Sequence, residues 1–319
     1  MNTSDLLLKL FGWLSISLIA AFMIDNIMIV GFNFPGAFSI FNEFSYLGIF
    51  ELLIYVTAGI VTYFLIKKYN LNFRKNSLIL HSLNIYLIRS FFWIILITGL
   101  VDIAIAFMRV EKVFELFLGK EIASNFSRPV FVGLYFHIPL VVIGFIVARF
   151  TKTIGFHWLS LLIVASELLI VITRFVFSYE QTFMGDLVRY WYAGLFLFAS
   201  AYTLYEDGHV RVDIIYQGLK EKTKSLVNCF GSILLGWSTS IVIILLCFNG
   251  KQSIVNSPVV NFEVTQQGSV GMFIKYHMAV FLAIFGITML IQFISYFFES
   301  IADYKNEKGK RIIETSTSH

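Results

Sequence analysis

Residues 155–177 read GFHWLSLLIVASELLIVITRFVF and contain only two charged side chains, Glu167 and Arg174. A helix of about 20 apolar residues is long enough to cross the roughly 30 Å hydrocarbon core of a bilayer. This block has that length, and its apolar residues do not alternate with polar ones as they would in a strand of an outer-membrane barrel. The stretch therefore predicts a transmembrane helix.

Seven further blocks have the same character. Together the eight predicted spans are 11–30, 45–66, 91–108, 129–149, 155–177, 187–204, 226–248 and 272–298. The composition agrees, because 58% of the 319 residues are hydrophobic and 14% are charged, with a mean hydropathy of +0.79. Soluble domains are about 45–50% apolar and about 25% charged. We therefore predict an all-α integral membrane protein with eight transmembrane helices, and we exclude a soluble enzyme.

The positions of Lys and Arg between the spans indicate the orientation. With the N-terminus in the cytoplasm, 15 of these side chains fall on the inner side and six on the outer side. Inner loops carry an excess of Lys and Arg in most membrane proteins. We therefore expect both termini to be cytoplasmic. The first block has no positively charged region before it, so we expect it to be a retained helix and not a cleaved export signal.

Two stretches predict short amphipathic helices at the membrane surface. Residues 77–89 mix Ser, His, Asn and Arg among Leu and Ile, so we expect them to lie at the interface and lead into the third span. Residues 212–219 have apolar side chains at helical spacing, followed by lysines at 220, 222 and 224. This pattern predicts a helix lying on the inner leaflet.

Ionisable side chains within spans are costly in lipid and are therefore candidates for functional positions. Glu167 lies near the middle of its span, and Arg174 follows two turns later on the same face. Glu167 could be an ion or proton ligand, or could bond to a neighbouring helix or a partner subunit. Asp25, Glu51 and Asp102 lie near the outer ends of their spans. There we expect a carboxylate to be solvated or to cap a helix.

Four histidines raise a different hypothesis. His137 and His277 lie toward the outer face, while His81 and His157 lie toward the inner face. Two pairs at two depths are typical of membrane cytochromes that hold two haems. Here, however, the four fall on four different segments. The sequence contains no phosphate-binding glycine loop, zinc-ligand spacing or nucleophile elbow. We therefore expect neither catalysis nor a cofactor.

The most distinctive run extends from the fifth span to the end of the sixth. It comprises Arg174-Phe175-Val176-Phe177-Ser178-Tyr179-Glu180-Gln181, then Asp186-Leu187-Val188-Arg189-Tyr190, and finally Glu206-Asp207-Gly208-His209-Val210-Arg211-Val212-Asp213. In this order and spacing, the run resembles the small permease subunit (DctQ-like) of tripartite ATP-independent periplasmic (TRAP) transporters. One departure is Gly194, where many members of that family carry Trp.

The resemblance covers residues 155 to about 300. The preceding helices, including the run from Gly99 through Asp102 to Arg109, resemble an N-terminally extended subclass that is often labelled with mannitol or chloroaromatic transport. This implies an N-terminal four-helix membrane extension at 1–153, a small-permease four-helix membrane domain at 154–300 and a cytoplasmic tail at 301–319. It also implies a multi-pass protein of the bacterial inner membrane.

The resemblance further implies a non-enzymatic scaffold in a sodium-coupled symport system that imports an organic acid or a related small solute. The implied partners are a large TRAP permease, a periplasmic solute-binding protein and membrane lipids, with no nucleic acid. Sodium ions would bind to the large permease and not to this chain. The alternatives are a self-sufficient secondary transporter and, more remotely, a di-haem membrane redox subunit.

The candidate residues form two groups. Those expected in subunit contacts or structural roles are Glu167, Arg174, Glu180, Asp186, Arg189, Gly208, His209, Arg211 and Asp213. Those expected to dock the binding protein lie in the outer loops 109–128 and 249–271, and are Phe114, Phe117, Asn261, Glu263 and Gln267.

Overall fold

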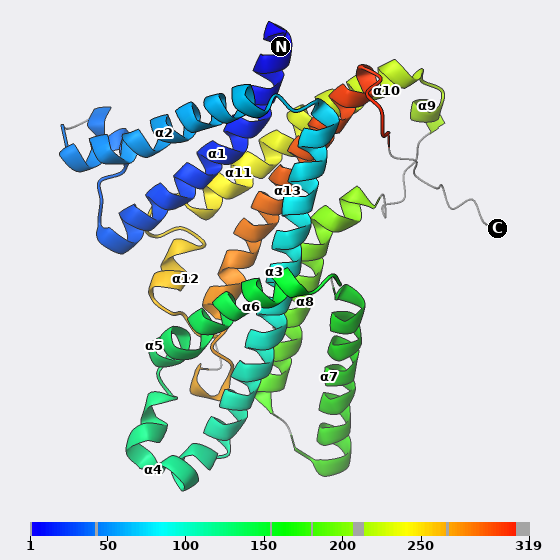
Figure 1. Ribbon diagram of the computed structural model, residues 1–319. Coiled ribbons are helices and arrows are strands. Elements are labelled where there is room, and N and C mark those ends of the chain that lie inside the picture. Colours follow the sequence, from blue (N-terminus) through cyan, green and yellow to red (C-terminus); the bar gives the residue numbers. More distant parts are fainter. Residues whose placement is uncertain are drawn as a thin grey trace. The chain divides into compact units, whose positions relative to one another are not determined.

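The computed structural model consists of helices joined by turns and loops (Figure 1). It describes residues 2–41, 44–153, 155–179, 181–206, 214–265 and 268–310, and no strand occurs within these ranges. The long uninterrupted helices are α1 (Thr3–Phe32), α2 (Tyr46–Tyr69), α3 (Phe73–Val110), α7 (Phe156–Phe177), α8 (Thr182–Tyr205) and α13 (Lys275–Tyr304).

Two further spans each contain a π-helical turn. The first comprises α5 (Pro129–Val132), η2 (Gly133–His137) and α6 (Ile138–Phe150), and the second comprises α10 (Glu221–Gly231), η3 (Ser232–Trp237) and α11 (Ser238–Cys247). The short helices are η1 (Ala37–Phe41), α4 (Val113–Asn125), α9 (Ile214–Gln217), α12 (Asn256–Val260) and η4 (Gly268–Val270).

In the described part of the chain, seven helical segments have the length and composition needed to cross a membrane. They coincide with seven of the eight predicted spans. The remaining span corresponds to α8, which is 24 residues long but is less apolar because it carries Asp186, Arg189 and several Tyr side chains. The predicted all-helical membrane fold is confirmed. The count of eight spans and the cytoplasmic position of both termini stay predictions.

The prediction of a separate surface helix at 77–89 is wrong. These residues belong to α3, which runs without a break for 38 residues. Two of their polar side chains are buried, where Ser77 Oγ is 3.0 Å from Ser295 Oγ and Asn84 donates to Gln292 at 3.3 Å, whereas Ser82 is exposed. The buried polar side chains of this part of α3 therefore contact polar side chains of α13, and not lipid headgroups.

The inner-leaflet helix predicted after the sixth span is described only in part. Residues 207–213 lie outside the described ranges, and the residues that follow form the single turn of α9 before α10 begins at Glu221.

The chain forms two compact units that do not follow chain order. Unit 1 comprises Met1–Asn84, Thr203–Gln252 and Met289–His319, and unit 2 comprises Ile85–Tyr202 and Ser253–Thr288. Helices α3, α8 and α13 contribute residues to both. The domain boundary expected near residue 153 stays a prediction.

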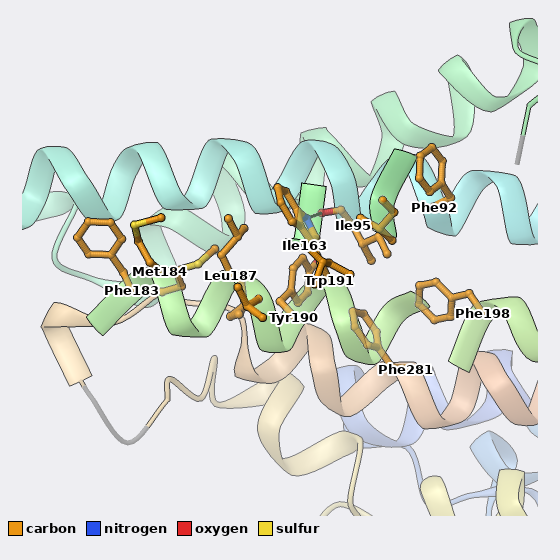
Figure 2. Close-up of a cluster of buried hydrophobic side chains, with 14 of the residues drawn as sticks. Phe92, Ile95, Ile163, Phe183, Met184, Leu187, Tyr190, Trp191, Phe198 and Phe281 are labelled. Carbon is orange, nitrogen blue, oxygen red and sulfur yellow. Dashed lines mark hydrogen bonds between the residues drawn. The ribbon is translucent and has the colours of Figure 1, made fainter. Parts of the chain in front are cut away.

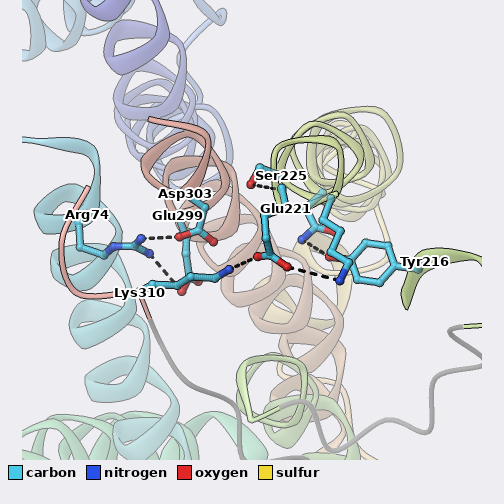
Figure 3. A network of polar contacts seen from close by, with 9 residues as sticks. Arg74, Tyr216, Glu221, Ser225, Glu299, Asp303 and Lys310 are labelled. Atoms are coloured by element: carbon cyan, nitrogen blue, oxygen red, sulfur yellow. Dashed lines mark hydrogen bonds and ion pairs between the residues drawn. The ribbon is translucent and has the colours of Figure 1, made fainter. Parts of the chain in front are cut away.

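In unit 1, the start of α3 is fixed to the end of α13 by charged groups (Figure 3). Arg74 is buried, with Glu299 at 3.5 Å and Asp303 in direct contact. The Glu307 carboxylate accepts the backbone N–H of Phe73 at 3.2 Å and that of Arg74 at 2.8 Å, so it caps the N-terminus of α3. This network lies at the end that we expect to be cytoplasmic.

A second contact in Figure 3 joins Lys310, beyond the end of α13, to Glu221 at the start of α10. Hydrogen bonding to the Glu221 carboxylate raises the pKa of Lys310 above its usual value. Both side chains are exposed, so this ion pair adds little to stability.

Unit 2 has an aromatic core between α3, α7, α8 and α13. Trp191 of α8 is 2% exposed and donates its indole N–H to the backbone carbonyl of Ile95 at 3.1 Å, and Figure 2 shows the two residues facing each other. Gly99 permits this approach, because a Cβ there would lie 2.4 Å from the indole nitrogen. Small residues at helix contacts let backbones approach closely in membranes.

We predict that Gly99→Ala destabilises the protein. The new methyl group would push Trp191 out of its packed position and break its bond to Ile95, at a cost of about 1–3 kcal/mol. Gly185→Ala in α8 is the matched control, because no atom lies within 4 Å of the place that its new methyl group would take. Thermal unfolding in detergent should show a lower midpoint for Gly99→Ala only. Equal midpoints would show that the Trp191 contact is unimportant.

Candidate functional site

The segment that leads into α13 is held by carboxylates from two other helices in unit 2. Asp186 of α8 accepts the backbone N–H of Met272 at 3.0 Å and the Thr265 hydroxyl at 3.2 Å. Asp102 of α3 accepts the backbone N–H of Phe273 at 2.8 Å. Both carboxylates are almost fully buried. Because the two successive amides bond to different helices, the start of α13 is fixed in position.

The second oxygen of Asp102 continues into a buried polar cluster. It lies 3.2 Å from Nε2 of His137, whose Nδ1 contacts the Tyr276 hydroxyl. A neutral His137 protonated on Nε2 would donate to Asp102 and accept from Tyr276. The adjacent His277 has its Nδ1 3.1 Å from the hydroxyl of Tyr190. These groups satisfy one another in a region where solvent is excluded.

The histidines do not have the arrangement expected for two haems. His137 and His277 do come together, with ring centroids 5.0 Å apart, but both nitrogens of His137 already have partners within the chain. In unit 1, His81 stacks on Tyr205 with ring centroids 3.4 Å apart. His157 is exposed in the first turn of α7. The geometry thus gives the haem hypothesis no support.

Arg109, at the end of α3, joins the two outer loops within unit 2. Its guanidinium donates to the carbonyl of Phe126 at 3.3 Å and to that of Gly271, and it lies 4.0 Å from the ring centroid of Phe273. Phe126 in turn stacks on Phe114 with ring centroids 4.0 Å apart. Arg109 therefore ties the loop that contains α4 to the segment just before α13.

The predicted docking residues differ in exposure. Phe114 is buried against Phe126, whereas Phe117 is 82% exposed. Asn261 is exposed, and Glu263 forms an ion pair with Lys275 at 2.6 Å. Gln267 lies outside the described residues. Phe117, Asn261 and Glu263 are thus the candidates whose side chains are placed to meet a partner.

The predicted subunit-contact residues are also divided. Glu167 and Arg174 are exposed on α7, and Arg189 is 70% exposed at 3.9 Å from Asp186. Asp186 itself points into the protein, where it holds the start of α13. The other candidates lie outside the described residues, namely Glu180, Gly208, His209, Arg211 and Asp213.

Three acids that we expected to be solvated or to cap helices are buried. Asp25 is 4% exposed, and Glu51 and Asp102 are 0% exposed. The expectation of solvation is therefore wrong for all three, because distance from the end of a span does not reveal which way a side chain faces. For Asp102 a signal was present, since Gly99, Asp102 and Arg109 recur at intervals of three and seven and so share one helix face.

Comparison with known protein families finds a match for part of the chain. Residues 163–303 match the family described as Tripartite ATP-independent periplasmic transporters, DctQ component. The chain therefore contains a region that is similar to the small permease of TRAP transporters. No curated protein and no solved structure gives a significant match. The resemblance read from the Arg174–Asp213 run is confirmed, and the chain is a multi-pass membrane component of a transport system.

The residues of the polar cluster in unit 2 lie partly inside and partly outside the matched range. Asp186, Met272 and Tyr276 lie within the small-permease region, which we define as residues 163–303, whereas Asp102 and His137 lie before it. A helix outside the small-permease region therefore supplies an acceptor to a backbone amide inside it.

We predict that Asp102→Ala loosens the segment before α13. The substitution leaves the Phe273 amide and His137 buried without their acceptor, which costs about 1–3 kcal/mol for each group. Hydrogen exchange of residues 268–276 should then be at least tenfold faster. Asp102→Asn keeps an oxygen acceptor and should have a smaller effect, and Glu167→Gln, on the exposed face of α7, should have none. Unchanged exchange in Asp102→Ala would contradict the proposed restraint.

Proposed function

We propose that this chain is the scaffold subunit of a sodium-coupled, binding-protein-dependent TRAP transporter in the bacterial inner membrane. The observation that carries this proposal is the small-permease match over residues 163–303. In this role the chain holds a large permease in the bilayer and helps to dock a periplasmic binding protein that delivers an organic acid or a related small solute. The large permease provides the sites for solute and sodium.

The use of polar groups in unit 2 supports a scaffold role. A carrier needs side chains that bind its solute and then release it. Here Asp102, Asp186 and His137 are buried and bonded to other parts of the same chain, including two backbone amides. Such contacts rigidify a bundle.

Helix α7 is the surface that we assign to the large permease. Few of its side chains are buried, and among the exposed ones are Leu161, Leu168 and Phe175. Glu167 is exposed near the middle of this helix. A carboxylate facing hydrocarbon at that depth is costly, so contact with another membrane protein is the more favourable environment.

We predict that Glu167→Leu lowers the yield of a larger integral membrane protein copurified with this chain. The substitution removes a polar contact from the interface but leaves the buried residues of α7 unchanged. Val61→Ala is the control, because it alters an exposed apolar side chain on a different helix, α2. The measurement is the ratio of the two proteins after affinity purification. Equal ratios in wild type and Glu167→Leu would remove α7 as the contact surface.

We also predict that Glu263→Lys weakens docking of the periplasmic binding protein. Because Glu263 pairs with Lys275, this substitution also places two like charges together. The double variant Glu263→Lys/Lys275→Glu restores the ion pair but keeps the reversed charge at position 263. Docking that stays weak in the double variant supports a direct contact with the partner, whereas full recovery assigns the effect to local structure. Unchanged affinity in the single variant contradicts the docking role.

Reconstitution tests the scaffold role as a whole. The purified chain in liposomes should not accumulate solute by itself, and accumulation should require the large permease, the binding protein and a sodium gradient. Transport by the isolated chain would favour the self-sufficient carrier and contradict the proposal.

A further inference from the structure

The helical hairpin α1–α2 encloses two acidic side chains that the small-permease match does not account for. Asp25 of α1 is 4% exposed and Glu51 of α2 is 0% exposed. They lie close enough for their charges to interact. Both belong to unit 1, and we refer to Asp25 and Glu51 as the carboxyl pair.

The loop between the two helices covers the carboxyl pair. Gly48 lies one turn before Glu51, and a Cβ at Gly48 would be 3.0 Å from the Ser39 hydroxyl in η1. The Ser39 hydroxyl donates in turn to the carbonyl of Gly36 at 2.7 Å, and Ala37 is 1% exposed. The first turn of α2 is therefore packed against η1, which explains why these acids are buried in an otherwise exposed hairpin.

The carboxyl pair has fewer hydrogen-bond donors than carboxylate oxygens. The Tyr55 hydroxyl donates to Oδ2 of Asp25 at 2.9 Å. Oδ1 of Asp25 and both carboxylate oxygens of Glu51 form no hydrogen bond of good geometry with the residues that the structure describes, although the backbone N–H of Gly36 lies near the Glu51 carboxylate. An oxygen buried without a donor costs about 1–3 kcal/mol, and more if the group is charged. Three such oxygens in one place indicate that a positively charged ligand belongs there.

The surrounding side chains do not supply that charge. Tyr55 of α2 is a neutral donor, and the residues of η1 are not titratable. The nearest cation that we identify at this end of α1 is Lys251, whose ammonium group binds the side-chain oxygen of Asn33 at 2.5 Å. In the described part of the chain, no ion pair involves Asp25 or Glu51.

We propose that Asp25 and Glu51 form a proton-binding site in which the two carboxyl groups share one proton. Two ionised carboxylates cannot remain side by side in a low-dielectric interior, and a shared proton removes one charge. It also makes an O–H···O bond, so it supplies a donor to oxygens that otherwise have none.

A metal ion fits this site less well than a proton. Hard cations such as calcium take about six to eight oxygen ligands. The carboxyl pair offers three unpartnered oxygens, and the loop packs tightly above it. The inference goes beyond the scaffold role and does not depend on it, because residues 25–55 precede the small-permease region.

The test uses the full chain in lipid nanodiscs and the infrared C=O stretch of protonated carboxyl groups. Ordinary carboxyl groups are ionised at about pH 8, because their unperturbed pKa is about 4. The wild type should keep one protonated carboxyl band at that pH. If the wild type lacks this band, the proposal is overturned, and no variant is needed for that conclusion.

Single substitutions test whether the proton is shared. In Asp25→Asn and in Glu51→Gln, one carboxyl remains beside an amide that can donate to it, so the remaining group should ionise and the band should be lost in both variants. Loss of the band in only one variant would mean that one acid holds the proton alone, which contradicts sharing. Glu115→Gln is the control, because it removes an exposed acid in the loop helix α4, outside the predicted spans, and should leave the band unchanged.

A salt exchange tests the metal alternative. Replacing sodium chloride by choline chloride at constant ionic strength should leave the unfolding midpoint of the wild type unchanged. A sodium-dependent rise in the midpoint that is absent from Glu51→Gln would overturn the proposal in favour of a sodium site. The midpoint of the double variant Asp25→Asn/Glu51→Gln, measured alongside, verifies that neutral replacements still fold.

Discussion

The fold depends on one constraint, which is that a polar group inside a membrane protein needs a partner within the protein. Lipid cannot form hydrogen bonds with it, and lipid chains are as apolar as Leu, so there is little hydrophobic driving force between helices. Polar contacts and close packing must therefore hold the bundle together. Helix α3 shows this most clearly. Its side chains Ser77, Asn84 and Asp102 all bond to α13 or to the segment before it.

This constraint makes the residues before position 163 structural partners of the small-permease region. In unit 1, Arg74 pairs with Glu299 and Asp303, and Asn84 with Gln292. In unit 2, Asp102 accepts the Phe273 amide. In each case an α3 residue outside the matched range satisfies a group inside it. Because Gln292 and the Phe273 amide are buried and Glu299 and Asp303 are partly buried, removing α3 would leave these groups without their partners, at several kcal/mol in total.

The sequence predicts the helices well because their signal is local. An apolar block such as 155–177 predicts the position of α7 (Phe156–Phe177) to within a residue. The direction in which a side chain points is not local, because it depends on the neighbouring helix. Residues 77–89 have the composition of an interfacial helix, and only the Gln292 and Ser295 side chains of α13, more than 200 positions away, explain why Ser77 and Asn84 are buried.

The acidic residues also show that the sequence does not reveal which way a side chain faces. The buried and the exposed acids have different requirements. Depth along the span singles out Glu167 as the costly carboxylate, yet Glu167 is on the surface, whereas Asp25 and Glu51, near the ends of their spans, are buried. Burial within the chain thus depends on the helix face and on the covering loop, and not on depth alone. Acids enclosed by the chain must be neutralised by it, through a donor or a proton. An acid on an exposed helix face in the bilayer must be satisfied from outside the chain, and this requirement fits a subunit that works beside a larger one.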